Sequence, residues 1–308
     1  MTLPVEAVCI TGPTASGKSS LAERVALELG SEVVSIDAMQ VYQGMDVGTA
    51  KVPVESRRCP LRMVDIIEIG QEYSVALFQR DARTCIDALL KEGVPAVLCG
   101  GTGLYLDAVI DEMVFPSGSK GNERRLRYEA CAESLGAEGL HALLSARDPA
   151  SAKLIEPANV RRVVRALEML DEGVSYAAHH EGLKRRSPHY AAQIWALRMN
   201  RATLHRRIEQ RVDEMFEHGL VEEVERLCAQ GLSRTSTAGQ AIGYKEVMAA
   251  LAGECTMDHA REMIKVRTRR YAKRQLSWLR RDGRCQWIDY DVVDEDEALE
   301  TILEHLRQ

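Results

Sequence analysis

Apolar and polar residues form blocks along the first third of the chain that predict strands separated by helices. Three mostly apolar runs have the length of buried strands, namely 5–11, 32–36 and 94–99. Helix-forming residues fill 18–29, which Gly30 closes, and 104–110. Strands that alternate with helices imply an α/β fold, so we expect a P-loop type of parallel-sheet core with helices on both faces.

The pattern changes from about residue 115 to residue 190, where every predicted element is a helix. Basic residues cluster there at three points, which are 124–127, 161–162 and 184–186. A further strand is predicted at 192–199, and helices resume from 202. We therefore expect a mainly helical insertion domain at 115–190 within a catalytic core formed by 1–114 and 191–308.

The first predicted strand runs into a glycine loop that satisfies the pattern G-x-x-x-x-G-K-[ST] in full. The loop consists of Gly12, Pro13, Thr14, Ala15, Ser16, Gly17, Lys18 and Ser19. Between a strand and a helix, such a loop lets backbone N–H groups converge on phosphate oxygens. Lys18 adds a positive charge, and Ser19 can hold Mg²⁺. The pattern identifies a phosphate site rather than a reaction, and by itself it leaves a small-molecule kinase open.

Polar residues follow the other two predicted strands, at the sheet edge where α/β proteins bind ligands. Asp37 comes directly after the second strand. It can take a proton from a nucleophile, cap the next helix or bind Mg²⁺, and position alone leaves these three roles open. Thr102 lies in the glycine-rich turn 100–103 after the third strand, where it can cap a helix or contact a substrate.

Arg211 lies on the apolar side of a predicted amphipathic helix. The apolar stripe of this helix is formed by Leu204, Ile208, Val212 and Met215. An arginine on a buried stripe needs an anion, because an unpaired buried guanidinium is costly. The anion is either an internal Asp or Glu, or a leaving phosphate group, which a guanidinium binds well.

Charge is distributed unevenly along the chain. The net charge of −6 argues against a nucleic-acid partner, but residues 261–284 hold ten Lys or Arg against two acids. The following segment, 285–308, holds eight acids and one Arg. A basic helix can simply be solvated, but this density, with Tyr271 and Trp278 interleaved, favours binding to a phosphate backbone. Thr268 and Gln275 on its inner face suggest that this side also faces a site.

Composition excludes several other classes of protein. Hydrophobic residues make up 45% and charged residues 28% of the 308 residues, which is typical of a soluble globular protein. No apolar run approaches the roughly 20 residues of a membrane span, and no secretory signal is recognised at the N-terminus. The eight cysteines are scattered without a CxxC pair, so we expect reduced packing thiols and a cytosolic protein.

Five motifs together resemble those of bacterial tRNA dimethylallyltransferases and occur in the same order. They are the glycine loop 12–19, the acid motif DAMQVY at 37–42, GGTGLY at 100–105, AIGYKE at 241–246 and TRRYAKRQLSW at 268–278. The resemblance extends from residue 5 to about 290 and is weakest at 115–190. Two departures occur, since Ala38 replaces a common Ser and the segment 59–65 lacks a His pair before Asp65.

The resemblance implies transfer of a dimethylallyl group from dimethylallyl diphosphate to N6 of adenine 37 in tRNA. Asp37 is then the base, Arg211 assists the leaving group and Thr102 orients the acceptor. The glycine loop holds the prenyl diphosphate and its Mg²⁺ rather than a hydrolysed nucleotide. The expected partners are the tRNA anticodon stem-loop and dimethylallyl diphosphate, with no membrane, and we expect a monomer.

The resemblance also implies a set of tRNA contacts on both parts of the chain. They are Asp37, Ala38, Met39, Gln40, Thr102, Arg124, Ala158, Asn159, Val160, Arg161, Arg162, Gln240, Ala241, Ile242, Gly243, Tyr244, Lys245, Arg267, Thr268, Arg269, Arg270, Tyr271, Lys273 and Arg274.

Three rival functions make different predictions. A prenyltransferase acting on free adenylate needs neither the basic patch at 261–284 nor the insertion. A P-loop kinase transfers a γ-phosphate and uses no prenyl donor. A non-catalytic tRNA-binding protein leaves the glycine loop and Asp37 unexplained.

Overall fold

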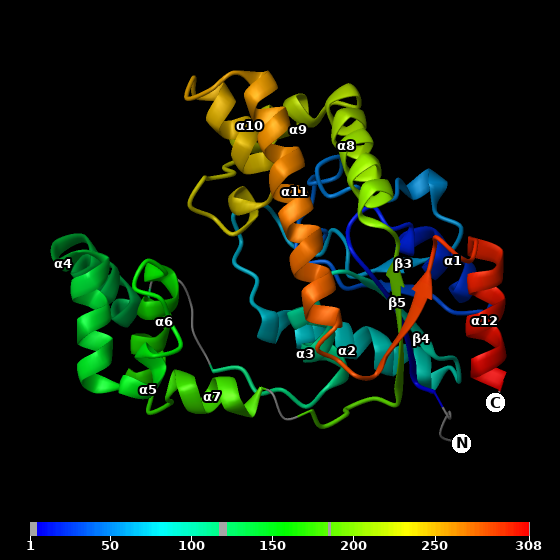
Figure 1. The fold of residues 1–308 in the computed structure, drawn as a ribbon, viewed down its shortest axis with the longest axis horizontal. Helices are drawn as coiled ribbons and strands as arrows, with labels where there is room; N and C mark the ends of the chain where they lie inside the picture. Colours follow the sequence, from blue (N-terminus) through cyan, green and yellow to red (C-terminus); the bar gives the residue numbers. More distant parts are fainter. Residues whose placement is uncertain (1–4, 117–121, 184–185, 308) are drawn as a thin grey trace. The chain divides into compact units, whose positions relative to one another are not determined.

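The computed structural model describes residues 5–116, 122–183 and 186–307, and the chain forms two compact units (Figure 1). The larger unit comprises Met1–Asp111 and Pro188–Gln308, and the smaller one Glu112–Ser187. The sequence pattern places the insertion at 115–190, three residues later at each end. Lys184 and Arg185 of the predicted basic cluster lie outside the described residues.

A six-stranded sheet with the order β3-β2-β4-β1-β5-β6 forms the centre of the larger unit. All neighbouring strands pair in parallel, which confirms the predicted α/β class. The strands are β1 (Ala7–Thr11), β2 (Val33–Ser35), β3 (Leu61–Arg62), β4 (Ala96–Gly100), β5 (Ala192–Arg198) and β6 (Cys285–Asp289). Sequence patterns indicate β1, β2, β4 and β5 but not the two edge strands.

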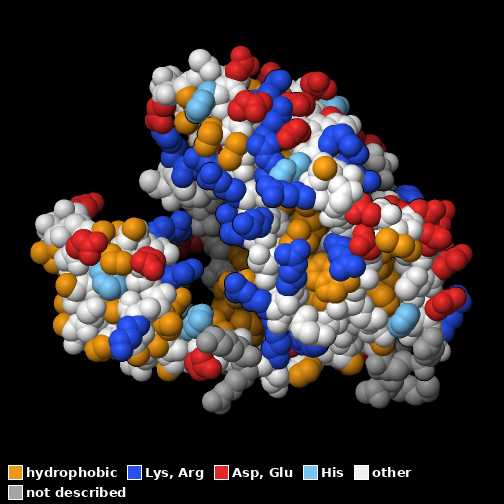
Figure 2. Space-filling view, in the orientation of Figure 1, with side chains coloured by type: hydrophobic (Ala, Val, Ile, Leu, Met, Phe, Trp, Pro, Cys, Tyr) orange, Lys and Arg blue, Asp and Glu red, His pale blue; other side chains and the backbone are white. Residues whose placement is uncertain are grey.

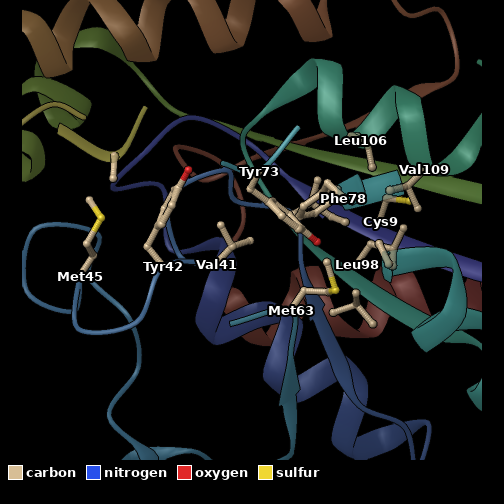
Figure 3. Packing of buried hydrophobic residues seen from close by; sticks show 14 of the residues in the cluster. Cys9, Val41, Tyr42, Met45, Met63, Tyr73, Phe78, Leu98, Leu106 and Val109 are labelled. Atoms are coloured by element: carbon tan, nitrogen blue, oxygen red, sulfur yellow. The ribbon is translucent and has the colours of Figure 1, made fainter. Parts of the chain in front are cut away.

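Helices cover both faces of this sheet, and its strands are therefore buried on both sides. Along β1, Ala7 and Cys9 pack into one core and Val8 and Ile10 into the other. Figure 1 shows α1 and α12 on one side of the sheet and α2 and α3 on the other. Figure 3 shows Cys9 in the core on the α2 and α3 side, together with Phe78 and Leu106. The helices are α1 (Lys18–Glu28), α2 (Val75–Lys91), α3 (Gly103–Ile110), α8 (Arg201–Glu217), α9 (Leu220–Ala229), α10 (Tyr244–Leu251), α11 (Met257–Leu279) and α12 (Glu295–Arg307), with short 3-10 turns η1 (Val54–Ser56) and η2 (Ala238–Gln240).

The smaller unit is helical and has its own apolar core. Leu140 and Leu144 of its first helix pack with Val163 and Leu167. Gly136 interrupts that first helix with a non-helical backbone at φ 70°. The helices are α4 (Glu123–Arg147), α5 (Pro149–Ala152), α6 (Val160–Asp171) and α7 (Tyr176–Gly182).

None of the helices traced in the described ranges is both long and apolar enough to cross a membrane.

Candidate active site

The glycine loop connects β1 to α1 as the sequence pattern predicts. Gly12 (φ 154°) and Gly17 (φ 92°) both adopt backbone angles that favour glycine. A Cβ atom on Gly12 would lie 3.1 Å from the carbonyl oxygen of Leu197, so the turn also needs the space that glycine leaves. Lys18 opens α1, and its Nζ donates to the carbonyl oxygen of Pro13 at 3.3 Å. The loop therefore presents N–H groups and one ammonium group to a common point.

The inner face of α11 packs directly on the two glycine-rich turns. Gln275 accepts a hydrogen bond from the backbone N–H of Thr14 at 2.8 Å and donates to the carbonyl oxygen of Gly101 at 3.0 Å. A Cβ atom on Gly103 would lie 2.2 Å from the Trp278 ring, whose Nε1 donates to Asp107 at 3.0 Å. One helix thus fixes the phosphate loop against the turn after β4.

A cavity of about 80 Å³ lies over the glycine loop. Lys18, Asp37 and Arg211 line it together. Burial lowers the pKa of Lys18, as does the Arg211 charge, while Cys99 and Asp37 oppose the shift. The remaining lining residues come from the glycine loop, α1, β2 and the turn after it, β4, the 49–61 segment and α11: Thr14, Ser19, Glu23, Val33, Ser35, Gln40, Thr49, Ala50, Val52, Cys59, Leu61, Cys99, Gly100, Tyr271 and Gln275.

A second cavity of about 360 Å³ adjoins the first. Both cavities share the same five lining residues, which are Thr14, Asp37, Thr49, Arg211 and Tyr271. The second has a more apolar wall from α8 and α11 and a polar rim. Its other lining residues are Ala38, Met39, Gly48, Thr102, Ile208, Val212, Met215, Thr237, Gln240, Ala241, Ile242, Ile264, Thr268 and Arg274. A phosphate cradle and an apolar chamber therefore meet at Asp37 and Arg211.

Asp37 holds its carboxylate in a fixed orientation. Oδ1 accepts from the backbone N–H of Met39 at 2.8 Å, which stabilises a turn rather than a helix. Oδ2 receives no hydrogen bond from the residues that the structure describes. Of the three roles that the sequence leaves open for Asp37, capping of a following helix is not found, because its carboxylate accepts within a turn.

Arg211 lies beside Asp37 on the buried stripe of α8. Burial lowers its pKa, and the charges of Asp37 and Glu214 oppose this effect. Its Nη2 contacts the Thr49 carbonyl oxygen at 3.5 Å. No Asp or Glu within the described ranges forms an ion pair with it, so the internal salt bridge considered from the sequence is not found. A desolvated guanidinium that forms no direct ion pair with a described residue fits an anionic ligand in the cavity.

Thr102 occupies the position before α3, but its side chain makes no capping hydrogen bond. The hydroxyl instead lines the second cavity. Tyr271 lies close to it, and burial followed by the Asp37 charge raises the pKa of this phenol, whereas contacts with Thr102 and Gln275 lower it. Both hydroxyl groups stay protonated near neutral pH and can serve a substrate as hydrogen-bond partners.

Comparison with family profiles assigns the chain that forms this site to a family. The profile described as IPP transferase matches residues 40–282, and a profile described as isopentenyl transferase matches 5–59. The chain belongs to the IPP transferase family.

Named relatives align with this sequence over almost the whole chain. A tRNA dimethylallyltransferase of Carboxydothermus hydrogenoformans is 44% identical over 97% of this chain and 95% of the relative. One from Streptomyces coelicolor is 46% identical over 94% of this chain and 92% of the relative.

Solved structures also superpose on almost the whole chain. The tRNA isopentenylpyrophosphate transferase of Bacillus halodurans superposes with a TM-score of 0.72 at 38% identity, covering 98% of this chain and 95% of that one. A eukaryotic dimethylallyltransferase acting on tRNA gives a TM-score of 0.77 at 25% identity, covering 95% of this chain and 77% of that one.

The basic residues of α11 in this IPP transferase family member fall into two groups. Those up to Arg269 are neutralised, since Lys265 pairs with Asp213 at 2.8 Å, Arg267 pairs with Glu246 and Arg269 pairs with Glu209. Those that follow are Arg270, Lys273 and Arg274, all exposed and without an ion pair in the described part of the chain. Figure 2 shows Lys and Arg side chains gathered over the part of the larger unit where α11 runs.

Tyr244 has a different role from the one that the resemblance implies. Its side chain is fully buried, and its hydroxyl donates to Glu223 at 2.5 Å. A side chain without exposed surface does not reach RNA, so the implied contact is corrected to a supporting one. The neighbouring Gly243, at φ 100°, is buried as well, and Lys245 donates to Gln240 at 3.1 Å.

The smaller unit carries the other implied tRNA contacts. Asn159 caps α6 by accepting from the N–H of Arg162 at 3.3 Å, and Arg124 pairs with Glu172 at 3.5 Å. Arg161 and Arg162 are exposed and form no ion pair with any residue that the structure describes. Ala158 is exposed and Val160 half-buried at the start of the same helix. This unit thus presents an exposed arginine pair at a capped helix N-terminus.

Sequence reasoning missed the loop 46–50, which lines both cavities through Gly48, Thr49 and Ala50. The Thr49 carbonyl accepts from Gln40 at 3.2 Å and from Arg211. The loop follows no predicted strand and holds no motif, so no pattern in the sequence pointed to it. Gln275, by contrast, could be recognised from the sequence as a site residue, because it is a polar residue on the inner face of a basic amphipathic helix.

Proposed function

We propose that the chain is a tRNA dimethylallyltransferase, which transfers the dimethylallyl group of dimethylallyl diphosphate to N6 of adenine 37 in tRNA. Membership of the IPP transferase family and relatives named for this activity support the proposal. The single observation that carries it is that Asp37 and Arg211 line both the phosphate cavity and the apolar chamber. An acceptor in one cavity and a diphosphate in the other would meet at these two side chains.

The reaction is a direct displacement at the allylic carbon. N6 of adenine forms a bond to that carbon while the bond from carbon to the diphosphate oxygen breaks. Asp37 accepts the proton that N6 loses, through the oxygen that Met39 leaves unused. Thr102 on the chamber wall orients the base.

The leaving diphosphate gains negative charge, which the glycine loop is built to stabilise. Backbone N–H groups of 12–19 and the Lys18 ammonium surround the phosphate cavity. Arg211, which forms no ion pair among the described residues, supplies a guanidinium to the same cavity. Donors fixed in advance are typically the largest catalytic contribution in such sites.

The chamber must also exclude water, because an allylic centre with cationic character would otherwise be hydrolysed. Its walls carry apolar side chains of α8, α11 and the 241–242 turn, including Ile208, Val212, Met215, Ile242 and Ile264. A base reaches this chamber only after leaving its stack in the RNA. The volume of about 360 Å³ is sufficient for an unstacked base.

RNA phosphates would be bound by the unpaired basic residues. Replacing Lys273 and Arg274 by alanine is expected to weaken tRNA binding and to lower the slope of log K against log salt by about 1.4, or 0.7 per lost phosphate contact. Filter binding between low and moderate salt measures this slope. Arg24→Ala is the matched control, since Arg24 is neutralised by Glu295 and Asp296. Equal slopes for the double variant and the wild type would contradict the role in RNA binding.

The phosphate cavity also suits Mg²⁺ in its donor chemistry. Ser19, Thr14 and Asp37 supply hard oxygen atoms to it. Within the described residues no cluster of three or more His, Cys, Asp or Glu side chains could hold a metal unaided. Mg²⁺ often binds through one or two protein oxygens together with substrate phosphates, so Ser19 and Asp37 fit a site completed by diphosphate. When bound, the ion would neutralise charge on the diphosphate.

Removal of divalent metal with EDTA is therefore expected to lower the transfer rate by more than about tenfold, because charge stabilisation by a metal is worth several kcal/mol. Quenched-flow transfer assays with and without added Mg²⁺ measure the effect. Transfer that continues at the full rate in EDTA would show that the protein needs no metal.

We also propose that the chain acts as a cytoplasmic monomer.

One assay tests the function against its rivals. Radiolabelled dimethylallyl diphosphate is offered with tRNA, with AMP or with neither, and γ-labelled ATP is offered in parallel. Label is expected on tRNA alone, at adenine 37. Label on AMP would indicate an adenylate prenyltransferase, and transfer from ATP would indicate a kinase. Binding of tRNA without any transfer would leave a non-catalytic binding protein.

A further inference from the structure

Glu223 of α9 is a buried carboxylate that lies outside both cavities. Its side chain is surrounded by hydrogen-bond donors, and the residue is only 5% exposed. Oε2 accepts from the backbone N–H groups of Asp46 at 2.9 Å and Val47 at 2.8 Å. Oε1 accepts from the N–H of Gly48 at 3.1 Å and from the Tyr244 hydroxyl at 2.5 Å. One carboxylate thus holds three consecutive backbone amides of the loop 46–50.

The packing around this carboxylate leaves the loop little freedom. A Cβ atom on Gly48 would lie 2.5 Å from the Tyr244 ring, so the loop backbone is in close contact with that ring. Thr49 donates through Oγ1 to the Met45 carbonyl oxygen at 2.6 Å. Lys51 donates to Asp46 at 2.9 Å and to the Tyr42 carbonyl oxygen at 2.7 Å. The loop is therefore fixed at both ends and in its middle.

The same loop reaches the reacting groups through one carbonyl. The Thr49 carbonyl oxygen accepts from the Arg211 guanidinium at 3.5 Å and from Gln40 at 3.2 Å. Gln40 in turn accepts from the Ser35 hydroxyl at the end of β2 at 2.8 Å. No acid among the described residues forms an ion pair with Arg211. The hydrogen bond found for its guanidinium is the one to the Thr49 carbonyl oxygen.

We propose that Glu223 is a positioning residue for the transfer reaction, which sets the Arg211 guanidinium through the loop 46–50. The inference rests on the proposed function and adds a residue outside the cavities to it. Loss of the carboxylate releases three amides and lets the Thr49 carbonyl move. A displacement of about 1 Å in a catalytic arrangement can cost about 10²-fold in rate.

Two substitutions separate this role from simple packing. Glu223→Ala removes all four acceptor contacts and is expected to lower kcat about 10²-fold while the KM for tRNA changes little. Glu223→Gln keeps the volume and an acceptor for Asp46 and Val47, and its amide can donate to the Tyr244 oxygen. The Gly48 N–H and the Tyr244 hydroxyl proton then both lose their acceptor. An intermediate loss of kcat is expected, with the protein still folded.

The matched control is Glu225→Ala. Glu225 lies two residues further along α9 and is exposed. It lines neither cavity, so its substitution is expected to leave kcat and KM unchanged.

The deciding measurement is a double-mutant cycle with Arg211→Ala, by single-turnover transfer of labelled prenyl group to tRNA. If Glu223 acts through Arg211, Glu223→Gln costs clearly less in the Arg211→Ala background than in the wild type. Full additivity, or a Glu223→Gln variant with wild-type kcat, would overturn the inference. A wild-type enzyme that transfers nothing to tRNA would refute the proposed function instead, so the two failures are distinguishable.

Discussion

Replacing Asp37 by asparagine is expected to lower kcat for transfer to tRNA by about 10³-fold, within the range typical for loss of a general base. The amide does not accept the N6 proton, although it has nearly the shape of the carboxylate. Single-turnover assays with saturating dimethylallyl diphosphate and tRNA measure the rate of the chemical step. Filter binding of tRNA to the same variant is expected to give an unchanged dissociation constant.

Asparagine is the informative substitution because its carbonyl oxygen can still accept from the Met39 N–H. The turn at 37–40 therefore persists, and a loss of rate is assigned to the missing base rather than to a displaced loop. Asp37→Ala, which removes the acceptor as well, is expected to abolish transfer while tRNA still binds. Wild-type turnover in either variant would refute the assignment of Asp37 as the base.

Arg211→Ala is expected to lower kcat by about 10²- to 10³-fold, which is the usual cost of removing one donor from a site of developing charge. The guanidinium stabilises the diphosphate as its bond to carbon breaks. Arg211→Lys restores the charge but not the planar donor geometry, so we expect it to recover only part of the rate. Quenched-flow measurement of diphosphate release gives these rates directly.

The control for Arg211 is Arg206→Ala on the same helix. Arg206 is exposed and lines neither cavity. Its substitution removes the same charge from α8 without touching the phosphate cavity. If both variants lost the same fraction of activity, the effect would come from overall charge, and the leaving-group role of Arg211 would be wrong.

The sequence predicted those parts of the fold that depend on local signals. The strands at β1, β2, β4 and β5 are mostly apolar runs, and the glycine loop is defined by residues that adjoin one another. Placing Asp37 and Thr102 at the ends of parallel strands was enough to bring them to one edge of the sheet, where both line the second cavity. The parallel topology of the sheet alone accounts for this correct prediction.

Features that depend on distant partners could not be predicted in this way. β3 has only two residues, and β6 is an edge strand whose pairing with β5 is set by tertiary structure. The basic helix looks uniform in sequence, but Glu209 and Glu246 neutralise two of its arginines from other helices. Tyr244 lies within a motif of the family and yet is buried. In each case the outcome depends on residues far away along the chain.

The contact between Thr14 and Gln275 has a consequence for how the protein is made. These residues are 261 positions apart, and β1 lies between β4 and β5, which the ribosome synthesises much later. The phosphate loop is therefore translated first but receives its hydrogen-bond support only when nearly the whole polypeptide has emerged. A nascent chain released before α11 would carry the complete glycine motif without the Gln275 acceptor that holds the Thr14 amide.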